Sequence, residues 1–189
     1  LSIVVNCAKK VKAMLFEDLQ ERLLRLDEDA SLLFDAPTHY RMIIVGGSAL
    51  ILLGRLSRAT HDIDTLSAPP QLFALLSKYD INAKAEAFIN NFPYNYEDRL
   101  VRLPLQTQKI DFFTPCLEDL VIAKLCSFRD TDIADVENAS VREQINWKLL
   151  DHLARDEGEA KASASNDRCY SEFLARYKEY VKRWRPCES

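Results

Sequence analysis

Residues 43–66 combine two polar clusters within one short stretch of apolar sequence. The stretch begins as an apolar, β-branched run, passes through a Gly-Gly-Ser turn at residues 46–48, and ends in Asp-Ile-Asp at residues 62–64. A short run of this kind predicts a buried strand, here over residues 40–45. The stretch therefore predicts a strand that leads through a tight turn into a helix and then to a strand carrying two acids.

Asp62 and Asp64 are two residues apart, so on a strand both point to one face while Ile63 turns into the core. Two carboxylates on one face repel each other unless a cation lies between them. Magnesium suits such a pair, because it prefers oxygen ligands, keeps several waters and accepts substrate phosphates as further ligands. An Asp-x-Asp pair alone is more often a solvated strand edge, so the metal-site interpretation depends on neighbouring groups.

A site that works with two metal ions needs a third carboxylate. Asp111 is the candidate, because it alternates with the core residues Ile110 and Phe112 and leaves its strand on the other face. If this strand lies beside the strand of Asp62, the three carboxylates converge. We therefore predict a shared metal site for Asp62, Asp64 and Asp111.

The glycine turn predicts a place where a phosphate chain can approach the backbone. Gly46 and Gly47 allow close contact, and Ser48 is expected to cap a helix over residues 49–56 whose first N–H groups attract anions. The turn lacks both the Gly-Lys-Ser/Thr ending of a P-loop and the three-glycine spacing of a dinucleotide fold. A tight turn with no ligand is the simpler interpretation of Gly-Gly-Ser alone.

The whole pattern predicts an α/β fold of the α+β type, with a small mixed sheet and a helical C-terminal half. The expected strands cover residues 40–45, 60–66, 100–105 and 108–113, the last two forming a hairpin or a pair of sheet neighbours. The expected helices cover residues 15–26, 49–56, 71–79, 83–90, 117–129, 141–154 and 170–184. The polar segment 155–167 is expected to be a mobile loop or a frayed helix.

Three parts of the chain are expected. Residues 14–115 form the α/β core and residues 116–189 the helical C-terminal region. Residues 1–13 are expected to be a tag or a mis-set start, because the chain begins with Leu and an amphipathic pattern follows Met14 directly.

Composition limits the class of protein. The formal net charge of -4 argues against broad nonspecific nucleic-acid binding, and no apolar run approaches the roughly 20 residues that span a bilayer. Five cysteines without a Cys-x-x-Cys pair favour reduced thiols and a cytoplasmic location: Cys7, Cys116, Cys126, Cys169 and Cys187. A basic, aromatic run over residues 176–185 could bind RNA, although such a run is more often a solvated helix face with its aromatic rings packed inward.

Taken together, these motifs resemble the nucleotidyltransferase superfamily related to DNA polymerase beta. The likeness within it is to small uncharacterised bacterial nucleotidyltransferases and abortive-infection toxin components, which share an Arg-x-Thr-x-Asp-Ile-Asp run, here residues 58–64. His61 replaces the Lys that often precedes the first Asp in such proteins. The likeness continues at residues 96–103 and 115–135, the latter with Lys124, Arg129 and an Asp-x-x-Asp pair.

The resemblance implies a nucleoside triphosphate bound through Mg²⁺ in a two-metal site. Asp62 and Asp64 would be metal ligands, Asp111 a ligand or base, and Lys124 a charge that meets the triphosphate, beside the Gly46-Gly47-Ser48 turn. Arg129, grouped with the nucleotide-binding residues, has two interpretations together with Asp132 and Asp135. The three residues either line the acceptor side or form a salt-bridge set at i, i+3 spacing on a helix.

The expected activity is transfer of a nucleoside monophosphate to a hydroxyl on RNA (tRNA included), a protein or a small molecule. A toxin acting with a cognate antitoxin is a further expectation. The alternative is a non-catalytic nucleotide-binding or partner-binding module on the same fold, and this alternative is favoured if Asp111 lies far from Asp62. Fold-level likeness does not choose the acceptor.

Overall fold

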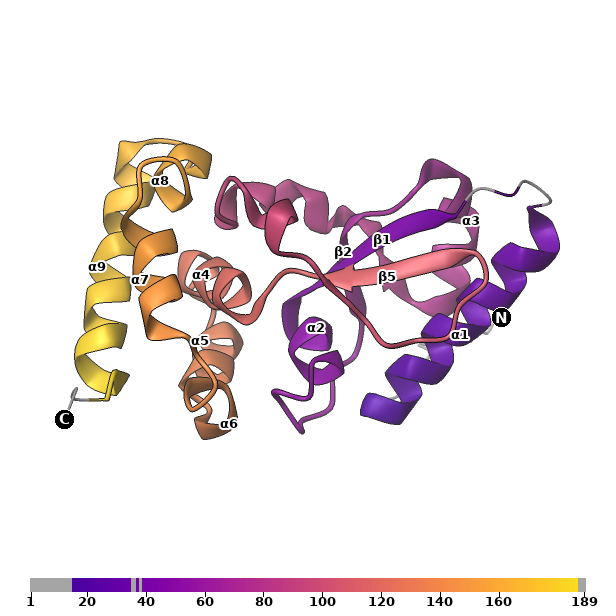
Figure 1. The fold of residues 1–189 in the computed structure, drawn as a ribbon, viewed down its shortest axis with the longest axis horizontal. Helices are drawn as coiled ribbons and strands as arrows, with labels where there is room; N and C mark the ends of the chain where they lie inside the picture. The colour runs from indigo at the N-terminus through magenta and orange to yellow at the C-terminus, as the bar shows by residue number, and fades with distance from the viewer. Residues whose placement is uncertain (1–14, 35–36, 38, 187–189) are drawn as a thin grey trace, which may run out of the picture.

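The computed structural model describes residues 15–34, 37 and 39–186. Within these residues a five-stranded mixed sheet lies between a long N-terminal helix at one end of the molecule and a group of helices at the other (Figure 1). The expected α+β class with a helical second half is confirmed. The expected tag or mis-set start, residues 1–13, lies outside the described residues.

The sheet has the strand order β3-β2-β1-β5-β4. Its members are β1 (Tyr40–Val45), β2 (Ile63–Ser67), β3 (Ile81–Asn82), β4 (Val101–Arg102) and β5 (Ile110–Thr114). The central strand β1 runs antiparallel to β2 and parallel to β5, and the hairpin expected for β4 and β5 is present. Residues 42–45 of β1 are all buried, as expected for an apolar strand covered on both faces.

Helices and short 3₁₀ segments connect the strands and follow them. The N-terminal ones are α1 (Phe16–Leu33), α2 (Gly46–Leu52), η1 (Pro70–Leu72), α3 (Phe73–Leu76), η2 (Ser77–Tyr79), η3 (Ala83–Asn91) and η4 (Tyr96–Arg99). After β5 come α4 (Leu117–Ser127), α5 (Asp130–Glu137), α6 (Ala139–Arg142), α7 (Trp147–Arg155), α8 (Ala160–Ser163) and α9 (Asp167–Trp184). Figure 1 shows α7, α8 and α9 gathered at the end of the molecule opposite to α1.

Helix α1 is joined to the start of β5 by one buried carboxylate. Asp27 is 4% exposed and accepts hydrogen bonds from the backbone N–H groups of Gln108, Lys109 and Ile110, at 2.8, 2.8 and 2.7 Å. Buried N–H groups without a partner are costly, so this carboxylate fixes the hairpin turn against the helix.

Replacing Asp27 with Ala should destabilise the fold by about 3 kcal/mol or more, because three N–H groups lose their acceptor at about 1–3 kcal/mol each. The free energy of unfolding, from urea titration, measures this. Glu28→Ala is the matched control: Glu28 is exposed on the same helix, and its loss should change stability by about 0.5 kcal/mol or less. Equal stability of the two variants would contradict this account of Asp27.

Helix α4 is the central helix of the C-terminal half, because residues 117–125 are all buried and the helix packs against α2, η3, α5, α7 and α9. A helix surrounded on all sides must pair every charge it carries. Asp119 pairs with Arg99 at 2.9 Å, and Glu118 accepts the N–H of Asn146 at 2.7 Å. Its third buried charge, Lys124, faces the pocket described below.

Two segments of the C-terminal half carry structure that the sequence did not predict. Segment 155–167, expected as a mobile loop or a frayed helix, contains the four-residue helix α8, and Glu159 within it is buried against Arg99 at 3.1 Å. The helix expected over residues 141–154 is broken, because the side chain of Asn146 accepts the N–H of Leu149 and starts α7 anew.

The basic run on α9 has its aromatic rings packed inward, while Lys178, Lys182 and Arg183 are exposed. Tyr177 and Tyr180 are buried, and the guanidinium of Arg142 stacks on Trp184 at 3.9 Å from the ring centroid. Arg176 donates to the carbonyl oxygen of Cys126 at 3.0 Å. The inward-packed interpretation of this run therefore fits the structure better than an RNA-binding face.

The described part of the chain contains three free cysteines and no helix suited to spanning a membrane. Cys116, Cys126 and Cys169 are free thiols, and burial raises the pKa of Cys126 to about 12, so this thiol stays protonated at neutral pH. Of the helices in the described ranges, none is both long and apolar enough to cross a bilayer.

Candidate functional site

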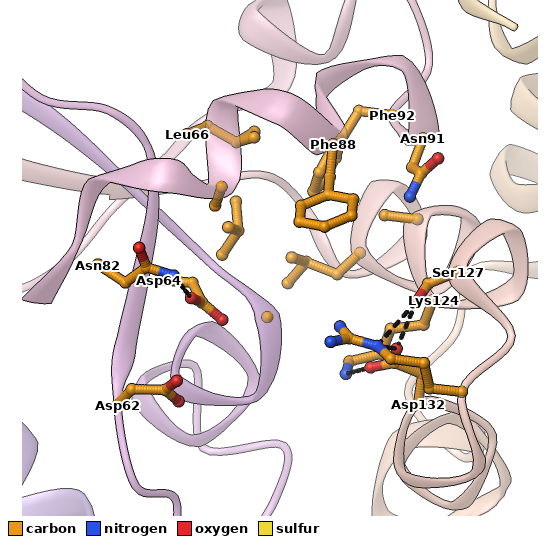
Figure 2. A pocket seen from close by; sticks show the side chains of 16 residues that line it. Asp62, Asp64, Leu66, Asn82, Phe88, Asn91, Phe92, Lys124, Ser127 and Asp132 are labelled. Atoms are coloured by element: carbon orange, nitrogen blue, oxygen red, sulfur yellow. Dashed lines mark hydrogen bonds and ion pairs between the residues drawn. The ribbon is translucent and has the colours of Figure 1, made fainter. Parts of the chain in front are cut away.

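A cavity of about 200 Å³ opens between the sheet and helices α4 and α5. Its volume is several times the roughly 30 Å³ that one water molecule occupies in the liquid, so it can take a larger group. Figure 2 shows Asp62 and Asp64 on one wall, and Lys124 and Asp132 on the wall across from them. Residues 60 to 70 positions apart in the chain thus meet in one pocket.

The first wall comes from the start of β2 and from the turn after β1. Asp62 directly precedes β2 and is exposed, whereas Asp64 lies within the strand and is half-buried. Oδ1 of Asp64 accepts a hydrogen bond from Nδ2 of Asn82 on β3, at 2.9 Å. Both carboxylates line the cavity, as their spacing predicts.

Gly46 makes room beside the Asp64 carboxylate. Its φ is +70°, a conformation that favours glycine, and a Cβ there would lie 3.1 Å from Oδ2 of Asp64. A larger residue at position 46 would therefore be strained and would crowd the carboxylate. This gives the glycine a defined role in the pocket wall.

The pKa of Asp64 is raised above its ordinary value. Burial is the main cause, and the charge of Asp62 adds to it, while the hydrogen bond from Asn82 acts in the opposite direction. A bound cation is the usual way to relieve two neighbouring carboxylates, because it favours their charged forms. A cation placed on this wall would therefore favour the charged form of Asp64.

Ser48 does not cap the helix that follows the turn. Helix α2 begins at Gly46 rather than at residue 49, and the Ser48 hydroxyl donates back to the carbonyl oxygen of Val45 at 2.9 Å. Ser48 is 2% exposed and does not line the cavity, so the predicted capping arrangement is wrong. Of the three turn residues, Gly46 alone contributes to the cavity wall.

The second wall carries a buried cluster of charges. Nζ of Lys124 donates to Oδ1 of Asp132 at 2.7 Å and to Oδ2 of Asp135 at 2.8 Å, and all three side chains are less than a tenth exposed. Burial opposes the charged forms of Asp132 and Asp135, but Lys124 and the other donors outweigh it and hold both pKa values below their usual range. These two acids are therefore ionised at neutral pH.

Both carboxylate oxygens of Asp132 accept hydrogen bonds from this cluster. Its Oδ2 accepts from the Ser127 hydroxyl at 2.7 Å and from Nε of Arg129 at 2.8 Å, in addition to the contact of Oδ1 with Lys124. The Arg129 side chain is 70% exposed and lines the cavity. Of the salt-bridge set expected for Arg129, Asp132 and Asp135, the Arg129–Asp132 pair is present, whereas Asp135 pairs with Lys124 and Arg58. Arg129 and Asp132 also line the pocket.

Arg58 extends the cluster to the glycine turn. Its guanidinium binds Asp135 with two bonds, Nε to Oδ1 at 2.6 Å and Nη2 to Oδ2 at 2.7 Å. A Cβ on Gly47 would lie 2.6 Å from Nη2 of Arg58, a distance shorter than real Cβ contacts, so the guanidinium would have to move. The second glycine of the turn is thus explained by Arg58 rather than by a bound phosphate.

The structure does not bring Asp111 to this pocket. Its strand β5 is separated from β2 by β1, and Asp111 pairs in register with Arg41 whereas Asp64 pairs with Val45. The Asp111 carboxylate contacts Arg102 and lies 3.8 Å from His39. The predicted convergence of three carboxylates is therefore wrong, because it required β5 and β2 to be neighbours.

The donor set fits one magnesium ion held by two carboxylates. Asp62 and Asp64 offer oxygen ligands only, and Mg²⁺ often takes one or two carboxylates together with waters and phosphates. In the described part of the chain, no group of three or more His, Cys, Asp or Glu side chains is arranged to hold a metal by itself. Further ligands would have to come from a substrate or from solvent.

Sequence reasoning missed several residues of the pocket, Asn82 and Phe88 among them, and it also missed Arg58 as a partner of Asp135. Asn82 ends the two-residue strand β3, too short to give a periodic signal. Phe88 lies in a segment whose pattern predicts only a short helix. Arg58 belongs to the Arg-x-Thr-x-Asp-Ile-Asp run, which marks it as a candidate. Its partner Asp135 lies 77 residues away, so the sequence does not show the pairing.

Comparison with known proteins agrees with this geometry. A family model described as "Nucleotidyltransferase of unknown function (DUF6036)" matches residues 21–185. The searches of curated proteins and of solved structures gave no match. The family match covers the sheet, both pocket walls and the whole of α9, which is well over half of the chain. The chain therefore belongs to this family of nucleotidyltransferases of unknown function.

Proposed function

We propose that the protein is a magnesium-dependent enzyme that moves a nucleoside monophosphate from a nucleoside triphosphate to an acceptor hydroxyl. One observation carries this proposal: two carboxylates and two cationic side chains line opposite walls of a single pocket, Asp62 and Asp64 on one side and Lys124 and Arg129 on the other. A metal-bound triphosphate needs negative groups for the ion and positive groups for the phosphates. The family match supports the reaction class.

Asp62 and Asp64 would hold the magnesium ion. The raised pKa of Asp64 and the space that Gly46 leaves beside its Oδ2 support this assignment. When bound, the ion would neutralise phosphate charge and orient the triphosphate. Asn82 positions Asp64 by donating to its other oxygen, Oδ1.

Arg129 and Lys124 would bind the phosphates. Arg129 is well placed because only its Nε is bound to Asp132 and Ser127, and its side chain is largely exposed at the cavity. Its remaining N–H groups can donate to phosphate oxygens in a planar, two-bond geometry. Lys124 is held by Asp132 and Asp135, so it would act as a fixed charge behind the phosphates.

In the proposed reaction an acceptor hydroxyl oxygen forms a bond to the α-phosphorus. The bond from that phosphorus to the pyrophosphate oxygen breaks, pyrophosphate leaves with the electron pair, and the hydroxyl proton is released to solvent. The chain contributes mainly by holding the phosphates in line with the acceptor and by compensating their charge.

The test is incubation with each of the four α-labelled nucleoside triphosphates and Mg²⁺, against total tRNA, total protein and a small-molecule pool. We expect label to enter one pool with one or two of the triphosphates, and the transfer to stop when EDTA removes the metal. Labelling that persists in EDTA, or no labelling of any pool, would contradict the proposal.

A second candidate is a module that binds nucleotide without turnover. Two observations favour it: Asp111 lies outside the pocket, and the Lys124 ammonium is already paired with two carboxylates. Calorimetry combined with the labelling assay separates the two candidates. Magnesium-dependent triphosphate binding with no transfer to any pool would support the binding module, and transfer would exclude it.

A further inference from the structure

The pocket has two chemically different ends. The charged side chains, among them Asp62 and Asp132, lie at one end, and Leu66, Phe88 and Phe92 lie at the other (Figure 2). Apolar residues of η3 and α4, Ala85 and Ala123 among them, also line the cavity. A ligand that fills the pocket must therefore be charged at one end and flat or apolar at the other.

Phe88 is the most unusual residue at the apolar end. It is 57% exposed, although it is a large apolar side chain, whereas Ala85 and Phe92 of the same region are buried. Figure 2 shows its ring extending into the space between the two walls. Among the described residues, no aromatic ring packs on it. The ring thus offers a free face inside a pocket.

Asn91 adds an amide to the lining of the same pocket (Figure 2). The Asn91 side chain lines the cavity and is half-buried, and no residue in the described ranges hydrogen-bonds to its amide. The neighbouring Asn90, in contrast, is engaged with Ser165 at 3.4 Å. An amide offers one donor side and one acceptor side, which is the pattern that reads the edge of a nucleobase.

We propose that the apolar end of the pocket holds the nucleobase of the triphosphate, stacked on Phe88 and hydrogen-bonded at its edge by Asn91. This inference rests on the proposed function, because it takes the phosphates to lie at the charged end. Stacking on an aromatic ring tolerates every base, while the hydrogen bonds to an amide differ from base to base. Phe88 therefore provides affinity, and Asn91 provides the choice among bases.

The two residues can be tested by calorimetry without acceptor, using magnesium complexes of ATP, GTP, CTP, UTP and tripolyphosphate. Tripolyphosphate is the probe for the charged end, since it has no base. Phe88→Ala should weaken the binding of the preferred triphosphate about five- to hundredfold, because the base loses the aromatic ring on which it stacks. The same variant should bind tripolyphosphate as the wild type does.

Asn91→Ala should weaken the preferred triphosphate about two- to tenfold, as expected for one lost hydrogen bond. It should also reduce the differences among the four triphosphates, which loss of stacking alone would not do. Phe73→Ala is the matched control, because Phe73 is 51% exposed on α3 and does not line the pocket. This control should bind all five probes unchanged, and circular dichroism checks that each variant is folded.

The outcomes distinguish the two levels of the proposal. If the wild type binds the triphosphates, and Phe88→Ala binds them equally well, the base site is wrong while the proposed function stands. If the wild type binds neither the triphosphates nor tripolyphosphate, the proposed function fails together with the base site. Equal weakening of tripolyphosphate and triphosphates by Phe88→Ala would also overturn the base site, since it would place Phe88 in the phosphate end or in the fold.

Discussion

Replacing both Asp62 and Asp64 with Asn should reduce nucleotide transfer about a thousandfold or more. Each substitution keeps the shape of the side chain but removes the charge that would hold the magnesium ion, and metal assistance supplies several kcal/mol at about 1.4 kcal/mol per tenfold in rate. The fold should survive, because the amide that replaces the Asp64 carboxylate can still accept the hydrogen bond from Asn82, and Asp62 is exposed. The measurement is the labelled-triphosphate assay with the pool that the wild type modifies.

Stability provides an independent check on the same variant. An acid whose pKa is raised on folding stabilises the fold only when protonated, and this contribution is present below its unfolded pKa and lost as the pH rises through the folded value. Asp64 is such a group, so its charge opposes folding at neutral pH. The double variant should therefore be as stable as the wild type at pH 7, or more stable. Clear destabilisation would show that the carboxylates have a structural role.

Asp111→Asn is the matched control for the loss of activity. Its strand lies on the far side of β1 from β2, and its carboxylate pairs with Arg102, lies 3.8 Å from His39 and does not line the pocket. Transfer should remain close to the wild-type rate. A loss comparable to that of the Asp62 and Asp64 variant would restore Asp111 as a catalytic residue and contradict the two-carboxylate site.

Replacing Lys124 with Met should destabilise the protein by about 3–5 kcal/mol at neutral pH, because removing one partner from a buried ion pair leaves an uncompensated charge. Here two buried acids, Asp132 and Asp135, lose the same ammonium. Urea unfolding measures the loss. Lys182→Met removes an exposed lysine on α9 and should change the free energy of unfolding by about 0.5 kcal/mol or less.

The effect of Lys124→Met should depend on pH in a defined direction. The folded pKa values of Asp132 and Asp135 are lowered, so their contribution to wild-type stability is present above the unfolded pKa of 3.8 and is lost as the pH falls through the folded values. In the variant the two acids can become neutral more easily. The difference in stability between wild type and variant should therefore be largest at neutral pH and shrink below about pH 4. A difference that does not change with pH would contradict the ion-pair explanation.

Local patterns in the sequence predict much of this fold. The buried strand β1 matches its predicted range, and the hairpin of β4 and β5 is present. The spacing of Asp62 and Asp64 predicts their common place on the pocket wall. These features depend on residues that are close in the chain, where periodicity and turn chemistry are informative.

The features that could not be predicted depend on distant partners. Alternation shows on which face Asp111 leaves β5, but it does not show which strand lies beside β5, and the strand order decided the outcome. Likewise the polar composition of segment 155–167 hides Glu159, whose burial depends on Arg99, 60 residues earlier. The engagement of Lys124 by Asp132 and Asp135 required the angle between α4 and α5, which no local pattern contains.

The contact among Gly47, Arg58 and Asp135 limits how this sequence can vary. The absence of a side chain at position 47 makes room for the guanidinium, and the guanidinium in turn compensates Asp135. A single change at any of the three disturbs the other two, so their effects on stability should not add. Natural or designed relatives that carry a larger residue at position 47 should therefore also carry a change at Arg58, and the three positions should vary together rather than one at a time.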